Sequence, residues 1–195
     1  MDNLFLKTLN HTLQFEGGYV HDPLDRGGET FRGISRVSNP DWPGWKLIDQ
    51  AKAQGARTAK LINAAFARDW EMEQAVAVLY YRRYWRPFEG LGASDRVMAK
   101  LFDTAVNVGV AGAVKTLQRA VNELDPAPEL AADGIIGPKT RAGLGSLIAV
   151  PGGEDRFLTA FCRMQETYYR DIVRRNPSQA KYLGGWLRRA AWTPE

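Results

Sequence analysis

A glycine-rich stretch at residues 17–35 divides the chain into a short apolar start and a long remainder. Before this stretch, apolar residues recur at four-residue spacing, which predicts one helix that Asp2 or Asn3 caps and that ends near Glu16. Glycines and an Asp-Pro pair interrupt helical periodicity inside the stretch. We therefore expect a small β-hairpin there, directly after the first helix.

Beyond a loop rich in Pro and Trp at residues 39–45, almost every segment shows helical periodicity. Pro, Gly and Ser residues separate these segments, and Pro138 stands where the first turn of a helix tolerates proline. The sequence thus predicts a mainly α (α+β) fold with one small β-hairpin. The predicted helices span residues 47–54, 59–67, 70–85, 94–109, 111–124, 139–148 and 154–175, with a short last helix around Trp186.

The composition fits a globular domain and excludes several other classes. Of the 195 residues, 45% are hydrophobic and 25% are charged, which leaves enough apolar side chain for a core. The longest charge-free stretch, residues 142–153, is too short to span a bilayer, so we expect no stable membrane insertion. Cys162 is the single cysteine, and His11 and His21 are too few for a zinc site. We therefore expect no metal and no other cofactor.

Positive charge is concentrated near the C-terminal end of the sequence. The formal net charge is +4, yet residues 156–189 carry eight basic and two acidic side chains. Such a field suits nucleic acid, an anionic membrane or a carboxylate-bearing cell wall. Charge alone does not choose among these partners, because a run of charges is usually a solvated helix face.

The densest cluster of reactive side chains lies in and beside the glycine-rich stretch, at Glu16, Asp22, Asp25 and Thr30. Cleavage of a glycosidic bond requires one protonated carboxylic acid and a second, ionised carboxylate. Glu16 lies on an element that must face a core, which favours its protonated form, whereas Asp25 stands in a turn beside Arg26. The plain alternative is that Glu16 ends a helix, that the two Asp residues shape turns, and that Thr30 is an ordinary strand residue.

The same residues resemble glycoside hydrolase family 108, the phage-associated N-acetylmuramidases. The resemblance implies a lysozyme-like helical domain in which Glu16 is the catalytic acid. We expect Asp25 and Thr30 to complete the catalytic set. Phage lysozymes have a similar order of Glu, Asp and Thr but usually one more residue before the Thr. The matching motifs read Glu16-Gly-Gly-Tyr19, Asp22-Pro23, Asp25, Gly27-Gly28-Glu29-Thr30 and Gly33-Ile34.

Motifs in the second half resemble the segment that this family's members carry as a peptidoglycan-binding region. Asn107 is a substrate-binding candidate by this resemblance, since lysozyme-like folds often place an Asn or Gln of such a segment against the cleft. The alternative for the middle motif is architecture, because Asp-Gly forms turns and Gly-Pro-x-Thr starts helices. The motifs are Asp103-x-x-Val106-Asn107-x-Gly109, Asp133-Gly134-x-x-Gly137-Pro138-x-Thr140 and Gly185-Trp186-x-x-Arg189.

Aromatic residues offer planes on which sugar rings can stack. Tyr19, Trp42 and Trp45 fall in predicted loops near the acidic cluster, so we expect them to bind substrate together with Asp22. Most other aromatic residues sit at helical spacing and are expected to pack in the core. These are Trp70, Tyr80, Tyr84, Trp85 and Tyr168.

Together these features predict an endolysin-type lysozyme with a catalytic lobe at residues 1–92 and a helical half at residues 93–195, packed as one unit. We expect hydrolysis of the β-1,4 bond between N-acetylmuramic acid and N-acetylglucosamine, with inversion, by a monomer that binds peptidoglycan and no nucleic acid. Asp2 and Lys7 interrupt the apolar start, so we expect no signal peptide, synthesis in the host cytoplasm, and a separate holin or transporter for passage to the wall.

Three alternatives to this hypothesis stay open. A lytic transglycosylase cleaves the same bond with one catalytic Glu and no water, and Asp25 argues only weakly against it. A wall-binding or secretion-accessory protein would need no catalysis, which the intact Glu16 motif disfavours. A nucleic-acid binder would use the basic C-terminal stretch.

Overall fold

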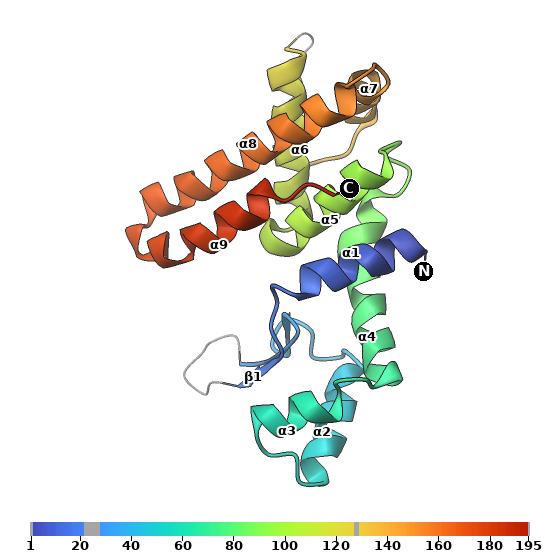
Figure 1. Cartoon of the computed structure of the whole chain (residues 1–195), viewed down its shortest axis with the longest axis vertical. Helices are drawn as coiled ribbons and strands as arrows, with labels where there is room; N and C mark the ends of the chain where they lie inside the picture. The colour runs from blue at the N-terminus through green and yellow to red at the C-terminus, as the bar shows by residue number, and fades with distance from the viewer. Residues whose placement is uncertain (1, 22–27, 127–128, 195) are drawn as a thin grey trace. The chain divides into compact units, whose positions relative to one another are not determined.

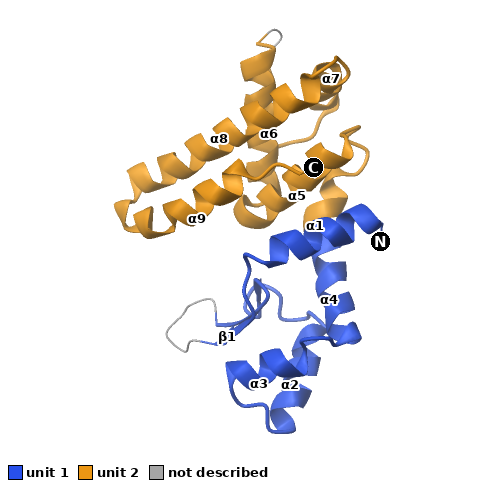
Figure 2. Cartoon of the chain, in the orientation of Figure 1, with its two compact units in different colours: residues 1–83 blue, residues 84–195 orange. Residues whose placement is uncertain are grey.

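The computed structural model describes residues 2–21, 28–126 and 129–194. Helices dominate these ranges, and one small sheet lies near the N-terminus (Figure 1), as the sequence predicts. The chain divides into two units, residues 1–83 and residues 84–195 (Figure 2). The division falls inside a continuous helical segment, whereas the sequence predicts a division after residue 92.

The first helix, α1 (Asn3–Leu13), begins and ends as local chemistry dictates. The Asp2 carboxylate accepts a hydrogen bond from the Phe5 amide at 2.7 Å, which confirms the predicted N-cap. The helix ends three residues before Glu16, because the amides of residues 14–16 bond to carbonyls three residues back and tighten the last turn. Gly17 then adopts a φ of 69°, in the left-handed region that glycine tolerates best.

A three-stranded antiparallel sheet follows, in the order β1-β2-β3. The predicted hairpin is β1 (Tyr19–His21) paired with β2 (Glu29–Phe31), and β3 (Ile34–Ser35) adds a short third strand. The Arg32-Gly33 turn joins β2 to β3, with φ angles of 45° and 76°. Positive φ at both central residues defines a tight two-residue hairpin turn whose twist matches the strands.

Three helices complete the first unit: α2 (Gly44–Ala53), α3 (Ala59–Ala65) and α4 (Trp70–Tyr80). Thr58 and Asp69 cap α3 and α4 by accepting hydrogen bonds from backbone amides. After Tyr80 the chain continues as a π-helical segment (Tyr81–Trp85) and a 3-10 turn (Arg86–Phe88). Trp70 was expected in the core but is 72% exposed, because it is the first residue of α4 and lies outside the buried stripe of that helix.

In the second unit, the residues described after the 3-10 turn form helices and the loops that join them. Ser94 caps α5 as predicted, Gly109 with a φ of 80° separates α5 from α6, and Pro138 begins α7. Its core is a single apolar cluster in which α6 packs on α5 and on α8, and α8 and α9 run side by side (Figure 1). The helices are α5 (Asp95–Val108), α6 (Val110–Leu124), α7 (Pro138–Ile148), α8 (Gly153–Arg175) and α9 (Ala180–Ala191), with a 3-10 turn at Pro177–Gln179.

Candidate active site

The half-buried Glu16 side chain lies in the turn that follows α1, against the backbone of the β2–β3 hairpin. A Cβ built on Gly33 would stand 2.8 Å from Oε2 of Glu16 and 2.8 Å from the Tyr80 hydroxyl oxygen. Real Cβ atoms do not approach other atoms so closely, so a larger residue at this position, where φ is 76°, would force the Glu16 carboxyl or the Tyr80 side chain to shift. The carboxyl of Glu16 and the hydroxyl of Tyr80 therefore converge on one point of the hairpin.

Tyr80 fixes this hairpin from the α4 side. Its hydroxyl donates a hydrogen bond of 2.7 Å to the Arg32 carbonyl oxygen, and its side chain is buried. Arg32 is the one non-glycine residue with positive φ among those described, so its backbone needs such support. The Arg32-Gly33 turn is thus held in place on the side that faces Glu16.

Each glycine of the Glu-Gly-Gly-Tyr motif occupies a position where a side chain would be unfavourable, for a different structural reason. Gly17 takes the left-handed conformation that ends the α1 turn. A Cβ on Gly18 would lie 2.5 Å from the Asn63 side-chain oxygen, which accepts a hydrogen bond from the Tyr19 amide at 2.8 Å. The motif therefore lets the chain leave α1, pass close to α3 and enter β1 with Glu16 held at the corner.

A buried ion-pair network under the sheet was missed by sequence reasoning, which treated Glu29 only as part of a motif. The Glu29 carboxylate is 8% exposed and accepts hydrogen bonds from the Tyr19 hydroxyl at 2.6 Å and from Arg36 at 2.6 Å. Lys52 pairs with the same carboxylate, and Arg36 also binds Asp49 at 2.8 Å. The network joins β1, β2, the segment after β3 and α2.

The network settles the charge state of its members. Burial alone would raise the pKa of Glu29, but hydrogen bonds from Lys52, Tyr19 and Arg36 outweigh it and lower the pKa to about 2. Burial also raises the pKa of the Tyr19 phenol, helped by its bond to Glu29. The hydrogen bonds from Arg36 lower the pKa of Asp49. Glu29 is consequently ionised and fully engaged with its three partners.

Strand alternation separates Thr30 from this network. Glu29 and Phe31 are buried, whereas Thr30 between them is half-buried and lies opposite Val20, which is 55% exposed. Thr30 therefore occupies the other, more open face of the sheet. Asp22 and Asp25 lie outside the described residues.

The three aromatic residues expected to bind substrate are buried. Tyr19, Trp42 and Trp45 are 6%, 6% and 2% exposed, and Trp45 lies in α2 because that helix begins at Gly44, three residues earlier than the sequence predicts. The two indoles meet edge to face with ring centroids 5.1 Å apart, and Trp42 also stacks on Phe31. Arg36 lies over the Trp45 ring, 5.2 Å from its centroid, and Trp42 also lines a pocket.

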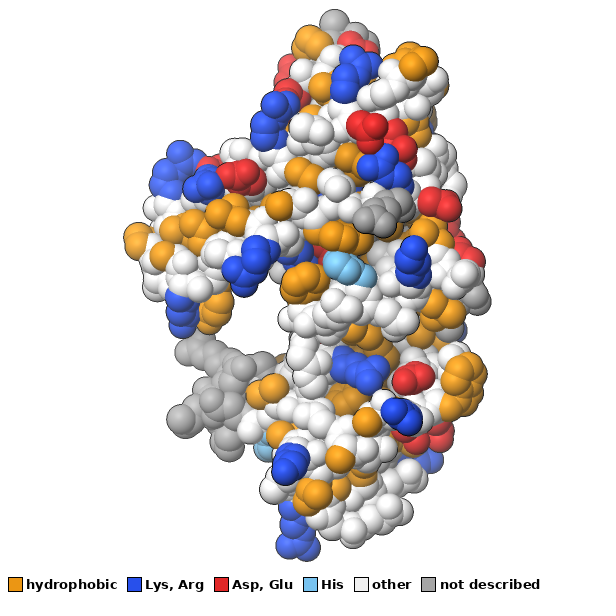
Figure 3. All heavy atoms as spheres, in the orientation of Figure 1, with side chains coloured by type: hydrophobic (Ala, Val, Ile, Leu, Met, Phe, Trp, Pro, Cys, Tyr) orange, Lys and Arg blue, Asp and Glu red, His pale blue; other side chains and the backbone are white. Residues whose placement is uncertain are grey.

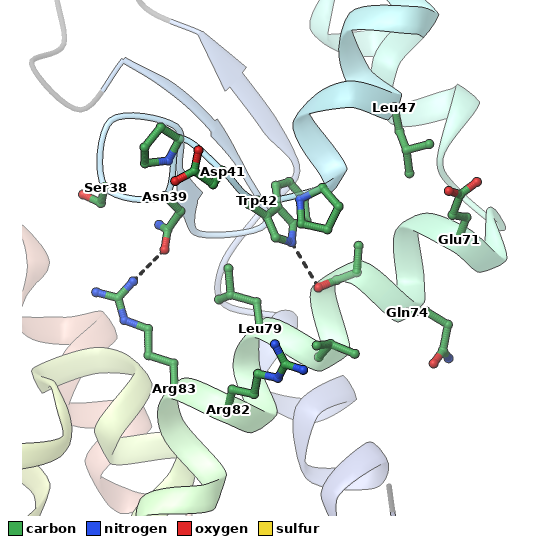
Figure 4. Close-up of a pocket in the computed structure, with 14 residues that line it drawn as sticks. Ser38, Asn39, Asp41, Trp42, Leu47, Glu71, Gln74, Leu79, Arg82 and Arg83 are labelled. Atoms are coloured by element: carbon green, nitrogen blue, oxygen red, sulfur yellow. Dashed lines mark hydrogen bonds between the residues drawn. The ribbon is translucent and has the colours of Figure 1, made fainter.

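A pocket of about 720 Å³ opens between the loop at residues 38–43 and α4 (Figure 4). The Trp42 indole nitrogen donates to the Ala75 carbonyl at 3.0 Å, and Arg83 donates to the Asn39 side chain at 2.9 Å, which ties the two walls together. Arg82 and Glu71 also line this pocket, whereas Glu16 does not.

In the second unit, buried contacts join the motif at residues 103–109 to the motif at residues 185–189. Arg189 binds the Asp103 carboxylate at 3.0 and 3.1 Å, with side chains 6% and 0% exposed, and so fastens α9 to α5. Asn107 accepts a hydrogen bond of 2.6 Å from the Tyr169 hydroxyl, and Tyr169 stacks on Trp186. Burial raises the pKa of Tyr169 to about 12, so its hydroxyl remains a donor.

The middle motif folds around Gln118 of α6. The Gln118 amide nitrogen donates to Asp133 at 2.8 Å and to Thr140 at 3.3 Å, and its oxygen accepts from the Gly134 amide at 2.9 Å. Gly134 has a φ of 83° and lies against α6, where a Cβ would meet the Ala111 carbonyl at 3.0 Å. These contacts support the architectural alternative for residues 133–140.

Neighbouring acids neutralise several cations of the basic C-terminal stretch. Within α8, Arg170 binds Glu166 at 2.6 Å and Arg174 pairs with Asp171, while Arg163 pairs with Glu123 of α6. On the face shown in Figure 3, acidic side chains accordingly lie among the basic ones. Glu166 and Asp171 are already part of the sequence count for residues 156–189, so only Glu123 lowers the local positive charge further.

The described ranges offer no group of three or more His, Cys, Asp or Glu side chains that could hold a metal ion. In those same ranges, no helix has both the length and the apolar character that crossing a membrane demands.

Comparisons with known proteins agree with these features. Residues 9–109 match the family described as "Glycosyl hydrolase 108", and residues 112–191 match the one described as "Predicted Peptidoglycan domain". The chain is similar to the solved structure of Brucella abortus SagA, with 25% sequence identity and a TM-score of 0.60 over 96% of this chain and 89% of that chain. No curated protein matches the sequence. The two family matches indicate a glycoside hydrolase that acts on the peptidoglycan of the cell wall, and the chain belongs to the glycosyl hydrolase 108 family.

Proposed function

We propose that the protein is an N-acetylmuramidase, a lysozyme that hydrolyses the β-1,4 bond between N-acetylmuramic acid and N-acetylglucosamine. One observation carries the proposal: the carboxyl of Glu16, at the family's motif position, is held half-buried against Gly33 and the Tyr80 hydroxyl. A carboxyl in this position is partly shielded from water and fixed in direction. Both properties suit a group that must hand a proton to a leaving oxygen.

Glu29 supports this assignment by elimination within the described part of the glycine-rich stretch. With three hydrogen-bond donors and a pKa of about 2, Glu29 stays ionised at any pH at which a lysozyme works. It therefore cannot serve as the proton donor. Its role is to anchor the strands that carry the hairpin beside Glu16.

In the proposed reaction, Glu16 protonates the glycosidic oxygen and Asp25 activates a water on the opposite face of the sugar. This geometry inverts the anomeric centre and requires roughly 6.5–9.5 Å between the two carboxyl groups. Thr30, on the open face of β2, helps to hold the water. Asn107 is proposed to contact substrate as well.

The decisive experiment compares Glu16→Gln with wild type on purified peptidoglycan. The amide keeps the shape but cannot donate a proton, so the rate should fall by ~10²–10⁴-fold with an unchanged melting temperature. Glu73→Gln, at an exposed position of α4 that does not line the pocket, is the matched control and should keep full activity. If Glu16→Gln keeps more than about one hundredth of the wild-type rate, Glu16 is not the general acid.

Product analysis separates the alternatives. A muramidase releases fragments with a reducing N-acetylmuramic acid end, whereas a lytic transglycosylase releases anhydro ends and consumes no water. Proton NMR of the first product should show the α-anomer for inversion. Asp25→Ala should be severely impaired and Asp22→Ala much less so; the reverse order would mean that Asp22 is the second carboxylate.

The cellular part of the proposal is an endolysin role. The protein acts as a monomer on the wall, after synthesis in the host cytoplasm and passage through a separate holin or transporter, with peptidoglycan rather than nucleic acid as its partner. Sedimentation should give a monomer mass, and a gel shift with duplex DNA at moderate salt should be negative.

A further inference from the structure

Gln165 of α8 is fully buried, and its side chain makes a single hydrogen bond within the described part of the chain. Its Nε2 donates to the Tyr169 hydroxyl oxygen at 2.9 Å, whereas its Oε1 has no hydrogen-bond partner there. Most buried polar atoms are paired, so a core glutamine with an unpaired oxygen costs stability. The bond to Tyr169 is therefore the feature of Gln165 that requires an explanation.

This bond decides in which direction the Tyr169 hydroxyl donates. A phenol carries one proton, and its oxygen can accept a hydrogen bond while that proton is donated elsewhere. Because the oxygen accepts from Gln165, the proton is donated to Oδ1 of Asn107, 2.6 Å away. Burial raises the pKa of Tyr169 to about 12, so the phenol keeps its proton. The hydrogen bonds thus run in one direction, from Gln165 through Tyr169 to Asn107.

The last of these bonds fixes the orientation of the Asn107 amide. The oxygen and the NH2 group of an asparagine are similar in size, so shape alone does not choose between the two orientations of the side chain. The Tyr169 proton chooses one of them, in which Oδ1 faces the hydroxyl and Nδ2 is directed away from it. Asn107 is half-buried, and its Nδ2 has no hydrogen-bond partner among the residues that the structure describes. A donor at a defined position is therefore available.

Packing holds Tyr169 in place for this contact. Its side chain is buried, and Trp186 of α9 stacks on it with ring centroids 5.4 Å apart and ring planes 24° from parallel. The ring is covered on one face and bonded at its hydroxyl, so it cannot turn away from Asn107. Three helices of the second unit contribute to the arrangement, because Asn107 is on α5, Tyr169 and Gln165 are on α8, and Trp186 is on α9.

We propose that Gln165 and Tyr169 are positioning residues that present the NH2 group of Asn107 as a hydrogen-bond donor to an oxygen of the glycan. The inference rests on the proposed function, in which Asn107 contacts substrate, and adds which polar atom makes that contact and which buried residues select it. The glycan offers suitable acceptors, because both of its sugars carry an acetamido carbonyl. The opposite orientation would place the Asn107 oxygen against a substrate oxygen, which is repulsive.

The first test is Asn107→Asp, assayed on peptide-free glycan strands. The carboxylate still accepts from Tyr169 but replaces the outward NH2 group by an oxygen, so KM should rise about tenfold while kcat changes little. Asn176→Asp is the matched control, because it adds the same charge at an exposed position where the side-chain oxygen already accepts from Ser178 at 2.7 Å. It should leave both constants unchanged.

Two further variants test the positioning residues. Tyr169→Phe keeps the ring and removes the proton that orients Asn107, so the amide must be ordered on binding and KM should rise by about threefold to tenfold. Tyr168→Phe, on the same helix, is its control and should keep the wild-type KM. Gln165→Glu, assayed at about pH 8 to ionise the new carboxyl, replaces the donor by an acceptor and draws the Tyr169 proton toward itself. Asn107 must then turn its NH2 group inward, and KM should rise about tenfold or more.

Nuclear magnetic resonance observes the Asn107 amide directly. The full chain with Glu16→Gln is labelled with ¹⁵N, and the Asn107 NH2 signal is assigned by its loss in Asn107→Asp. Peptide-free glycan strands should shift this signal on binding, because the NH2 group gains an acceptor. With Gln165→Glu added, the NH2 group is already bonded to Tyr169, so the signal should respond little to the same strands. Merely structural roles for Gln165 and Tyr169 would lower the melting temperature without this difference.

Three results would overturn the inference: a wild-type KM in Asn107→Asp, an Asn107 NH2 signal that ignores the glycan, or a wild-type KM in both Tyr169→Phe and Gln165→Glu. The products of the wild-type enzyme test the proposed function separately. Muramidase products without a shift of the Asn107 signal would keep the proposed function and reject this inference. A shift together with anhydro products would keep the inference and reject hydrolysis.

Discussion

The Gly33 backbone and the Glu16 carboxyl are so close that a single methyl group would not fit between them: a Cβ on Gly33 would lie 2.8 Å from Oε2 of Glu16. The tight turn between β2 and β3 therefore does more than reverse the chain. It forms the surface against which the candidate acid is positioned, so the shape of a turn and the direction of a carboxyl are coupled.

Gly33→Ala should consequently lower the rate of peptidoglycan cleavage by about 100-fold, as expected when a catalytic group is displaced by about 1 Å. Gly92→Ala is the control, because Gly92 has the same φ of 76° but open space around its Cα. Both variants should lose about 1–3 kcal/mol of unfolding free energy from backbone strain, and only Gly33→Ala should lose activity. Equal activity in the two variants would show that Gly33 does not position Glu16.

Tyr80→Phe tests the same turn from its other side. Removing the hydroxyl leaves the Arg32 carbonyl without that donor and should cost about 1–3 kcal/mol of unfolding free energy. The rate constant kcat should fall as well, while KM should change little, because the hydroxyl is expected to position Glu16 rather than bind sugar. A variant that is destabilised but keeps the wild-type kcat would limit Tyr80 to a structural role.

Local chemistry made much of this fold predictable from sequence. The caps Asp2 and Ser94, the break at Gly109 and the helix start at Pro138 all depend on residues within one turn of each other. The β-hairpin follows from glycines and strand alternation in the same way. The third strand was not expected, because it contains only two residues and exists through the Arg32-Gly33 turn.

The parts that sequence did not predict depend on residues far apart in the chain. Glu29 is bound by Arg36 and by Lys52 of α2, and no local pattern shows that these three side chains meet under a sheet. An acidic residue at an inward position of a strand was the available signal. Trp42 and Trp45 looked like loop aromatics because Pro43 and Gly44 are typical loop residues, whereas α2 begins at Gly44 and contains Trp45.

Glu29 makes stability depend on pH in the acid range. Its pKa falls from 4.5 to about 2 on folding, so the folded state holds fewer protons, and the contribution is present above about pH 4.5 and lost as the pH falls toward 2. Glu29→Gln should lower the unfolding free energy at pH 7 by about 1.5–3 kcal/mol. Denaturant titrations between pH 5 and pH 2 should show that this variant loses less unfolding free energy on acidification than wild type does. This range brackets the pKa values of 4.5 and about 2. Parallel curves would mean that the network around Glu29 does not control acid stability.

The buried pair of Asp103 and Arg189 should matter far more for stability than the exposed pairs on α8. Asp103→Asn leaves the guanidinium, 6% exposed, without a counter-charge and should cost about 3–5 kcal/mol in denaturant unfolding. Glu166→Gln removes an exposed partner of Arg170 and should cost less than about 1 kcal/mol. Because Arg189 is on α9, Asp103→Asn should also loosen that helix and increase amide hydrogen exchange along it. If the two variants were equally stable, α9 would be held by its aromatic contacts rather than by this ion pair.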